Sequence, residues 1–115
     1  MSDLSLKRLG LAPLFDPREG TTVVEPVGSG TGWWAGAPSV LYDDDTEKFY
    51  LYYRIRRPRG VEPDRGGECC IAESSDGVSF REIWRAHKSQ FESTSMERAA
   101  LVKGLNGGWK LFLSY

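Results

Sequence analysis

Residues 48–55, KFYLYYRI, restrict the fold more than any other part of this sequence, because they are apolar on both faces of a strand. Successive side chains of a strand point to opposite faces. One face would carry Phe49, Leu51, Tyr53 and Ile55, and the other would carry Tyr50 and Tyr52. A strand with two apolar faces belongs to a sheet that is packed on both sides. We therefore predict stacked layers of β-sheet.

Short β-branched and aromatic runs separated by turn residues predict further strands, paired as hairpins. The predicted strands are residues 38–42, 48–55, 68–74, 78–84, 97–103 and 109–115. The predicted turns are Asp43-Asp44-Asp45, Ser75-Asp76-Gly77 and Asn106-Gly107-Gly108, where short polar side chains bond to nearby backbone and glycine accepts positive φ. Residues 1–32 are loop-rich, with one helical turn predicted over residues 2–11. Residues 85–96 form a polar connector without periodicity.

The composition is that of a globular protein and excludes several classes of function. Of 115 residues 40% are hydrophobic, and 15 basic against 16 acidic residues leave one net negative charge. This balance argues against nucleic-acid binding. The absence of an apolar run of about 18 residues argues against a membrane span, and the cytoplasm is the expected location. Cys69 and Cys70 are adjacent, so a strand sends them to opposite faces and we expect free, buried thiols.

Two segments share one plan, which predicts a repeat. In both, an apolar strand, a polar turn and an aromatic-led strand follow one another, and Phe49 and Leu51 in the first match Trp109 and Leu111 in the second. The offset of about sixty residues is typical of four-stranded propeller blades. We predict an all-β chain of antiparallel four-stranded blades. Residues 33–115 would form one blade and the first half of a second, about one and a half blades of an incomplete domain.

Residues 32–115 resemble the first blades of the five-bladed β-propeller glycoside hydrolases, the superfamily of families 43, 32 and 130. The resemblance rests on GWWAGAPSVLYDDDTEKFYLYYR, RGGECCIAESSDGVSF and ERAALVKGLNGGWKLFLSY. Its most specific piece is IAESSDGVSF, which is similar to the hairpin between the third and fourth strands of a blade. The resemblance implies the N-terminal portion of a longer five-bladed propeller.

In such propellers the innermost strands line a funnel, and glycoside cleavage needs two carboxylates held across it. Ala37 stands where the family 43 pattern has its first catalytic aspartate, so this segment departs from the pattern that the family uses for hydrolysis. Glu97 and Arg98 begin the second innermost strand, so the resemblance implies Glu97 as a candidate catalytic carboxylate and Arg98 as a substrate-binding donor. The alternative is an exposed Glu-Arg pair at a strand entrance.

Four further residues are candidates for substrate binding. The resemblance places Trp33 and Trp34 at the rim of the funnel, where indoles stack on sugar rings, although packing in the core or a loop would also explain them. Arg54 and Glu68 flank an arginine-rich segment that would close over a sugar site or form a plain solvated loop.

No cofactor or metal is expected. His87 is the single histidine and has no partner at ligand spacing, so zinc is excluded. Asp43-Asp44-Asp45 lacks the pattern of a calcium loop and is better explained as a turn. Residues 28–32, GSGTG, lack the Lys-Ser/Thr end of a phosphate loop.

Two functional interpretations follow. The first is a glycosidase-like propeller protein that cleaves or binds a glycan in the cytoplasm; the enzyme assignment stays open because the acid/base pair is incomplete. The second is a non-catalytic carbohydrate-binding or interaction module that self-associates. An unpaired apolar edge at residues 109–115 would pair with another chain, so we expect a homo-oligomer, with no nucleic-acid and no membrane partner.

Overall fold

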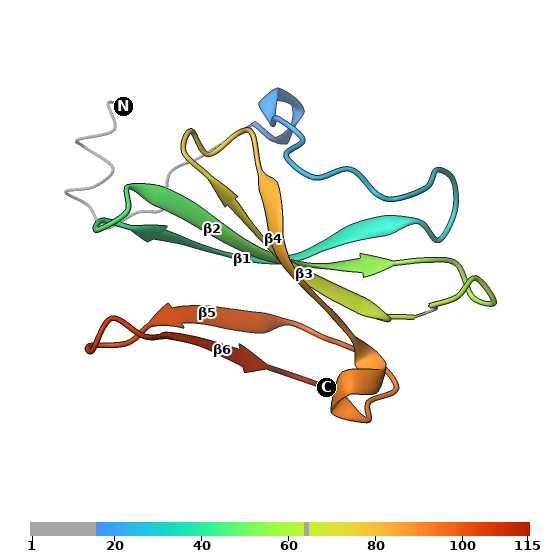
Figure 1. The fold of residues 1–115 in the computed structure, drawn as a ribbon. Helices are drawn as coiled ribbons and strands as arrows, with labels where there is room; N and C mark the ends of the chain where they lie inside the picture. Colours follow the sequence, from blue (N-terminus) through green and yellow to red (C-terminus); the bar gives the residue numbers. More distant parts are fainter. Residues whose placement is uncertain (1–15, 64) are drawn as a thin grey trace.

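The computed structural model describes residues 16–63 and 65–115, which form two antiparallel sheets (Figure 1). The four-stranded sheet has the order β1-β2-β3-β4, and β5 pairs with β6 in a separate hairpin. The elements are η1 (Pro17–Glu19), β1 (Trp34–Asp43), β2 (Lys48–Arg56), β3 (Glu68–Ser74), β4 (Arg81–His87), η2 (Lys88–Phe91), β5 (Ala99–Lys103) and β6 (Trp109–Leu113), of which η1 and η2 are single 3-10 turns. The predicted all-β class is confirmed.

Two predictions are not tested by the described residues. The first is the propeller, since these residues form two sheets and no closed ring of sheets. The second is the helical turn predicted for residues 2–11, which lies outside the described residues. Within the same described part of the chain, no helix has the length and apolar character needed to span a membrane.

Both faces of the four-stranded sheet are packed, as the alternation in β2 predicts. On one face the buried residues are Leu51, Tyr53, Ile55, Cys70 and Ala72, with Val24 and Phe80 against them. On the other face they are Tyr52, Cys69, Ala86 and Met96, with Leu111 and Leu113 of β6 against them. The β5–β6 hairpin is thus a second layer, drawn below the four-stranded sheet in Figure 1.

The two cysteines lie on these opposite faces, and both are free and fully buried. Burial raises the pKa of both thiols, that of Cys70 to about 12. The prediction of free, buried thiols is confirmed.

Strand β4 starts later than predicted, at Arg81 instead of residue 78. The cause is Asp76, whose carboxylate accepts the backbone N–H groups of Val78 at 2.9 Å and Ser79 at 2.8 Å. These bonds lower the pKa of Asp76 to about 2 and hold residues 78–80 in the turn. The sequence signature around Asp76 therefore specifies a hairpin turn.

Strand β1 starts earlier than predicted, at Trp34 instead of residue 38. Its pairing with β2 is interrupted between Gly36 and Ser39 by an irregularity in which Ala37 has φ of 53°. Positive φ is unfavourable for a residue with a Cβ atom, and such bulges are common beside binding sites. Because of the bulge, β1 continues to Trp34 and reaches the end of the sheet where the candidate residues gather.

Candidate functional site

Three side chains from distant parts of the sequence meet at one end of the sheets: Trp34 of β1, Arg54 of β2 and Glu97, which precedes β5. The guanidinium carbon of Arg54 lies 5.1 Å from the centroid of the Trp34 ring. Arg54 forms an ion pair with Glu97, and its Nη1 also donates to the Met96 carbonyl oxygen at 2.9 Å. We call these three residues the Trp34–Arg54–Glu97 cluster. Three of the six predicted site residues are thus in contact.

Glu97 is held as an ionised carboxylate. The Ser95 hydroxyl donates to its Oε1 at 2.8 Å, and Tyr52 donates from its buried hydroxyl to the Glu97 backbone carbonyl at 2.7 Å. The hydrogen bond from Ser95, together with the charges of Arg54 and Arg65, keeps the pKa of Glu97 below its usual range. At neutral pH this group can accept hydrogen bonds or act as a base, but it is not a proton donor.

The close approach of Gly66 to the segment before β5 brings Glu97 to β2. Gly66 has φ of +64°, and its carbonyl accepts the Met96 N–H at 2.7 Å. A Cβ atom at this position would lie 2.3 Å from the Ser95 hydroxyl oxygen and 2.7 Å from the Met96 carbonyl oxygen. A side chain here would push Ser95 and Glu97 away from Arg54.

A cleft of about 220 Å³ opens beside Arg54 and Glu97. The other residues that line it are Arg56, Arg65, Gly66 and Ser95. Among the described residues only one carboxylate, that of Glu97, lines this cleft, whereas cleavage of a glycosidic bond needs two. The cleft also explains why Arg54 stays partly accessible, with 17% of its side chain exposed.

A second cleft, of about 430 Å³, adjoins the first, because Arg56 and Arg65 line both. We call it the arginine cleft; its lining residues are Thr31, Gly32, Trp33, Trp34, Arg56, Arg57, Pro58, Arg59 and Arg65. Gly28 packs flat beneath the Trp33 indole, since a Cβ atom there would lie 2.5 Å from the ring. Trp33 is therefore partly a packing residue of the loop, as the alternative interpretation expects.

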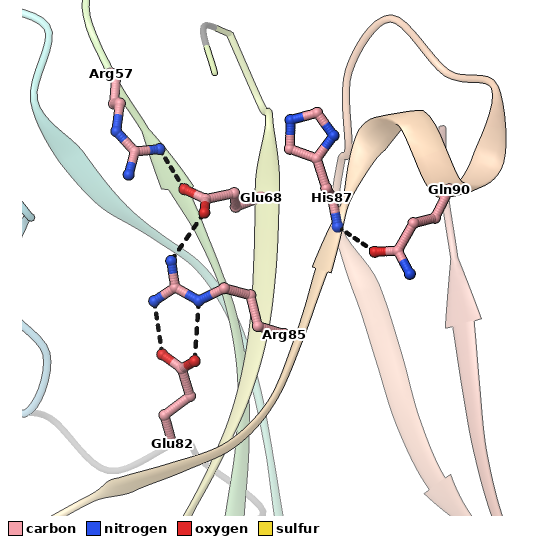
Figure 2. Close-up of polar contacts among 6 residues, drawn as sticks. All are labelled: Arg57, Glu68, Glu82, Arg85, His87 and Gln90. Carbon is pink, nitrogen blue, oxygen red and sulfur yellow. Dashed lines mark hydrogen bonds and ion pairs between the residues drawn. The ribbon is translucent and has the colours of Figure 1, made fainter. Parts of the chain in front are cut away.

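Glu68 does not belong to the Trp34–Arg54–Glu97 cluster. It pairs with Ile55, so its side chain projects from the face opposite to that of Arg54. It forms ion pairs with Arg57 and Arg85, and Arg85 in turn binds Glu82 (Figure 2). Burial alone would raise the pKa of Glu68, but the hydrogen bonds from Arg57 and Arg85 outweigh it and keep the pKa low. The Glu68 carboxylate is therefore neutralised by ion pairs with two arginines.

Arg98 follows Glu97 and is exposed, with its backbone carbonyl accepting the Ser114 N–H at 3.1 Å. His87 lies outside both clefts. Its backbone N–H donates to the Gln90 side chain at 2.6 Å and its Nδ1 accepts the Ser89 N–H at 3.1 Å, so it caps η2 (Figure 2). These contacts give His87 a structural role.

The aspartates of the β1–β2 turn bind a lysine of the second sheet. The Nζ atom of Lys103 on β5 forms ion pairs with Asp43, at 2.6 Å, and with Asp45. Asp43 is almost fully buried, and its other carboxylate oxygen accepts the Thr46 hydroxyl at 2.7 Å. Among the residues described, no group of three or more His, Cys, Asp or Glu side chains is arranged to hold a metal ion.

Comparison of the chain with family models, with curated proteins and with solved structures found no match.

Ser95 and Gly66 were not singled out from the sequence, although both shape the site. Ser95 lies in the connector before β5, where no periodicity marks a role. The signal that could have identified Gly66 is the pair Gly66-Gly67 just ahead of a strand, since glycine there allows positive φ and close backbone approach.

Proposed function

We propose that the Trp34–Arg54–Glu97 cluster is a saccharide-binding site in the N-terminal portion of a glycosidase-like, five-bladed propeller protein. The observation that carries the proposal is the contact of the Arg54 guanidinium with the Trp34 indole on one side and the ionised Glu97 carboxylate on the other. Arg54 and Glu97 line the smaller cleft, and Trp34 lines the arginine cleft that adjoins it. Sugar rings offer C–H faces to indoles and hydroxyls to charged donors and acceptors. The two free thiols fit the cytoplasmic location that we propose with it.

The repeated hairpin supports the propeller. Leu51 of β2 lies opposite Val40, and Leu111 of β6 lies opposite Leu101, so the two hairpins share a register. Leu51 packs on the face of its sheet that turns away from β5–β6, whereas Leu111 packs toward the first sheet. Each leucine thus faces away from the sheet that would follow its own hairpin in the chain, as equivalent positions of successive blades would.

Binding is favoured over cleavage for the part of the chain described. Ala37, at the position of the family's first aspartate, is a buried methyl group in the β1 bulge. Glu97 is the one carboxylate of the described residues that lines the cleft, and its low pKa does not suit a proton donor. A second carboxylate from another segment would be needed for hydrolysis.

The test is calorimetric titration of the chain with a panel of oligosaccharides, followed by titration of variants with each ligand found. Arg54→Met and Glu97→Gln should each weaken binding at least tenfold. Glu19→Gln, an exposed change on η1, is the matched control and should leave the affinity unchanged. Wild-type affinity in both cluster variants, with their fold intact by circular dichroism, would refute the assignment, as would a panel without any ligand.

A further inference from the structure

The arginine cleft contains four guanidinium groups and no carboxylate among its described lining residues. Arg56, Arg57, Arg59 and Arg65 come from the end of β2 and the loop that follows it. Trp34, which is 38% exposed, lines the same cleft. The chain as a whole has one net negative charge, so this concentration of positive charge is local.

Among the described residues, neighbouring carboxylates form an ion pair with only one of these four arginines. Glu68 is paired with Arg57, and Glu97 is paired with Arg54 in the adjoining cleft. Within the described residues no carboxylate forms an ion pair with Arg56, Arg59 or Arg65. Like charges gathered in a concave surface focus the potential and attract an anion.

The residues of the cleft favour one kind of anion. A guanidinium donates two parallel N–H groups, which match the two oxygens of a planar carboxylate or a pair of oxygens of a tetrahedral sulfate group. Trp34 provides an apolar surface at the same place, and a volume of about 430 Å³ lies within the range of roughly 300–1,000 Å³ typical of small-molecule sites. A nucleic-acid strand would need a cationic track along the surface, whereas the four arginines of this cleft come from one short segment, residues 56–65.

We propose that the arginine cleft binds the carboxylate or sulfate group of an acidic saccharide. Its neutral hydroxyls would lie toward Arg54 and Glu97. This inference rests on the saccharide-binding site proposed above and specifies its ligand class. Arg56 and Arg65 line both clefts, so one ligand can occupy the two together. Arg57 and Arg59 line the arginine cleft alone, and because Arg57 is paired with Glu68, Arg59 is the residue whose replacement tests recognition of the acidic group.

The experiment compares digalacturonate, a sulfated disaccharide and the neutral galactose disaccharide of the same linkage, with inorganic sulfate, inorganic phosphate and a short single-stranded DNA as further arms. At least one acidic disaccharide should bind at least tenfold more tightly than the neutral one, and its affinity should fall as salt is added. Arg59→Gln should weaken the acidic ligand at least tenfold and leave the neutral one unchanged. Arg18→Gln, on the exposed η1, should change neither.

Three results would overturn the inference, and they separate it from the proposed function. Equal affinities for acidic and neutral disaccharides would refute the acidic ligand but leave the saccharide site standing. Inorganic sulfate or phosphate bound as tightly as the acidic disaccharide would show that the sugar contributes nothing. Binding of the DNA alone, with no disaccharide bound, would refute both proposals.

Discussion

Arg54 links the packing of the two sheets to the candidate site. Its Nη1 holds the Met96 carbonyl and the Glu97 carboxylate, both in the segment that leads into β5. Its Nε is buried and has no hydrogen-bond partner among the described residues. A buried donor without an acceptor is costly, and such groups are often kept at functional sites. The same guanidinium therefore fixes Glu97 in place and remains open to the cleft on one side.

The two acidic residues predicted for the site, Glu68 and Glu97, differ in their roles because of strand register. From the sequence both are expected at the site, Glu97 as a candidate catalytic carboxylate and Glu68 as a substrate-binding residue. The pairing of Ile55 with Glu68 decides the matter by sending Glu68 to the face opposite to that of Arg54. A register shifted by one residue would have placed Glu68 on the same face as Arg54.

Replacing Glu68 by Gln should destabilise the chain by about 1–2 kcal/mol at pH 7, because Arg57 and Arg85 lose a partly buried, charged acceptor. The pKa of Glu68 is lowered in the fold, so this stability is complete above the ordinary pKa of 4.5 and is lost as the pH falls through the lower folded-state value. Urea unfolding at pH 7 and at successively lower pH measures the difference, which should shrink below pH 4.5.

Glu19→Gln is the control for this measurement, because Glu19 is exposed and its replacement should change stability by less than about 0.5 kcal/mol. Equal urea midpoints for Glu68→Gln and the wild type at pH 7 would contradict the structural role assigned to Glu68.

At the scale of the elements, alternation and turn residues predict which strands exist, but they do not predict where each strand begins and ends. All six strands were expected, and the two faces of β2 were assigned correctly. The sequence pattern misplaces the starts of β1 and β4, because these starts depend on the bulge at Ala37 and on the hydrogen bonds of Asp76. It also makes the last two strands too long, since β5 begins at Ala99 instead of residue 97 and β6 ends at Leu113 instead of residue 115. The η2 turn was missed for a similar reason, since its capping by His87 is local and aperiodic.

The contact of the hairpin with the four-stranded sheet is centred on Met96, which is fully buried between them. Met96→Ala should therefore leave a cavity beside Tyr52 and lower the free energy of unfolding by about 2–4 kcal/mol. Urea denaturation followed by tryptophan fluorescence measures this loss. Leu105→Ala is the matched control, because Leu105 is fully exposed in the β5–β6 turn and its truncation should cost less than about 0.5 kcal/mol. Similar losses for both variants would show that the hairpin is not held by this core.

At the scale of the whole molecule, the two sheets are joined by apolar packing and by polar contacts at both ends of the shared layer. Lys103 binds Asp43 at one end, and Tyr52 and Arg54 bind the segment around Glu97 at the other. The candidate site therefore depends on the docking of β5–β6, because one of its three groups belongs to the segment that precedes β5. The sequence could predict the layers from alternation, but the convergence of Trp34, Arg54 and Glu97 is a tertiary contact that no local pattern specifies.

The outer surface of the β5–β6 hairpin leads to the last prediction, which concerns self-association. Side chains alternate along the hairpin, so Leu111 faces the first sheet while Phe112 points outward with 63% of its surface exposed. Val102 is also exposed, and among the described strands β6 is hydrogen-bonded to β5 alone. An apolar edge strand with free N–H and C=O groups is a template for pairing with another chain. We expect the 115-residue chain to form dimers or larger assemblies at micromolar concentration, measured by sedimentation velocity.

Phe112→Lys should shift this equilibrium toward the monomer, because an edge lysine opposes strand pairing and the lost phenyl ring removes apolar contact area. Val78→Lys introduces the same charge at an exposed apolar residue of the β3–β4 turn and should leave the assembly intact. A concentration-independent monomer for the wild type would contradict the prediction outright. Assembly that persists equally in both variants would mean that another surface mediates it, because only Phe112→Lys places a charge on the hairpin's outer face and removes the exposed phenyl ring.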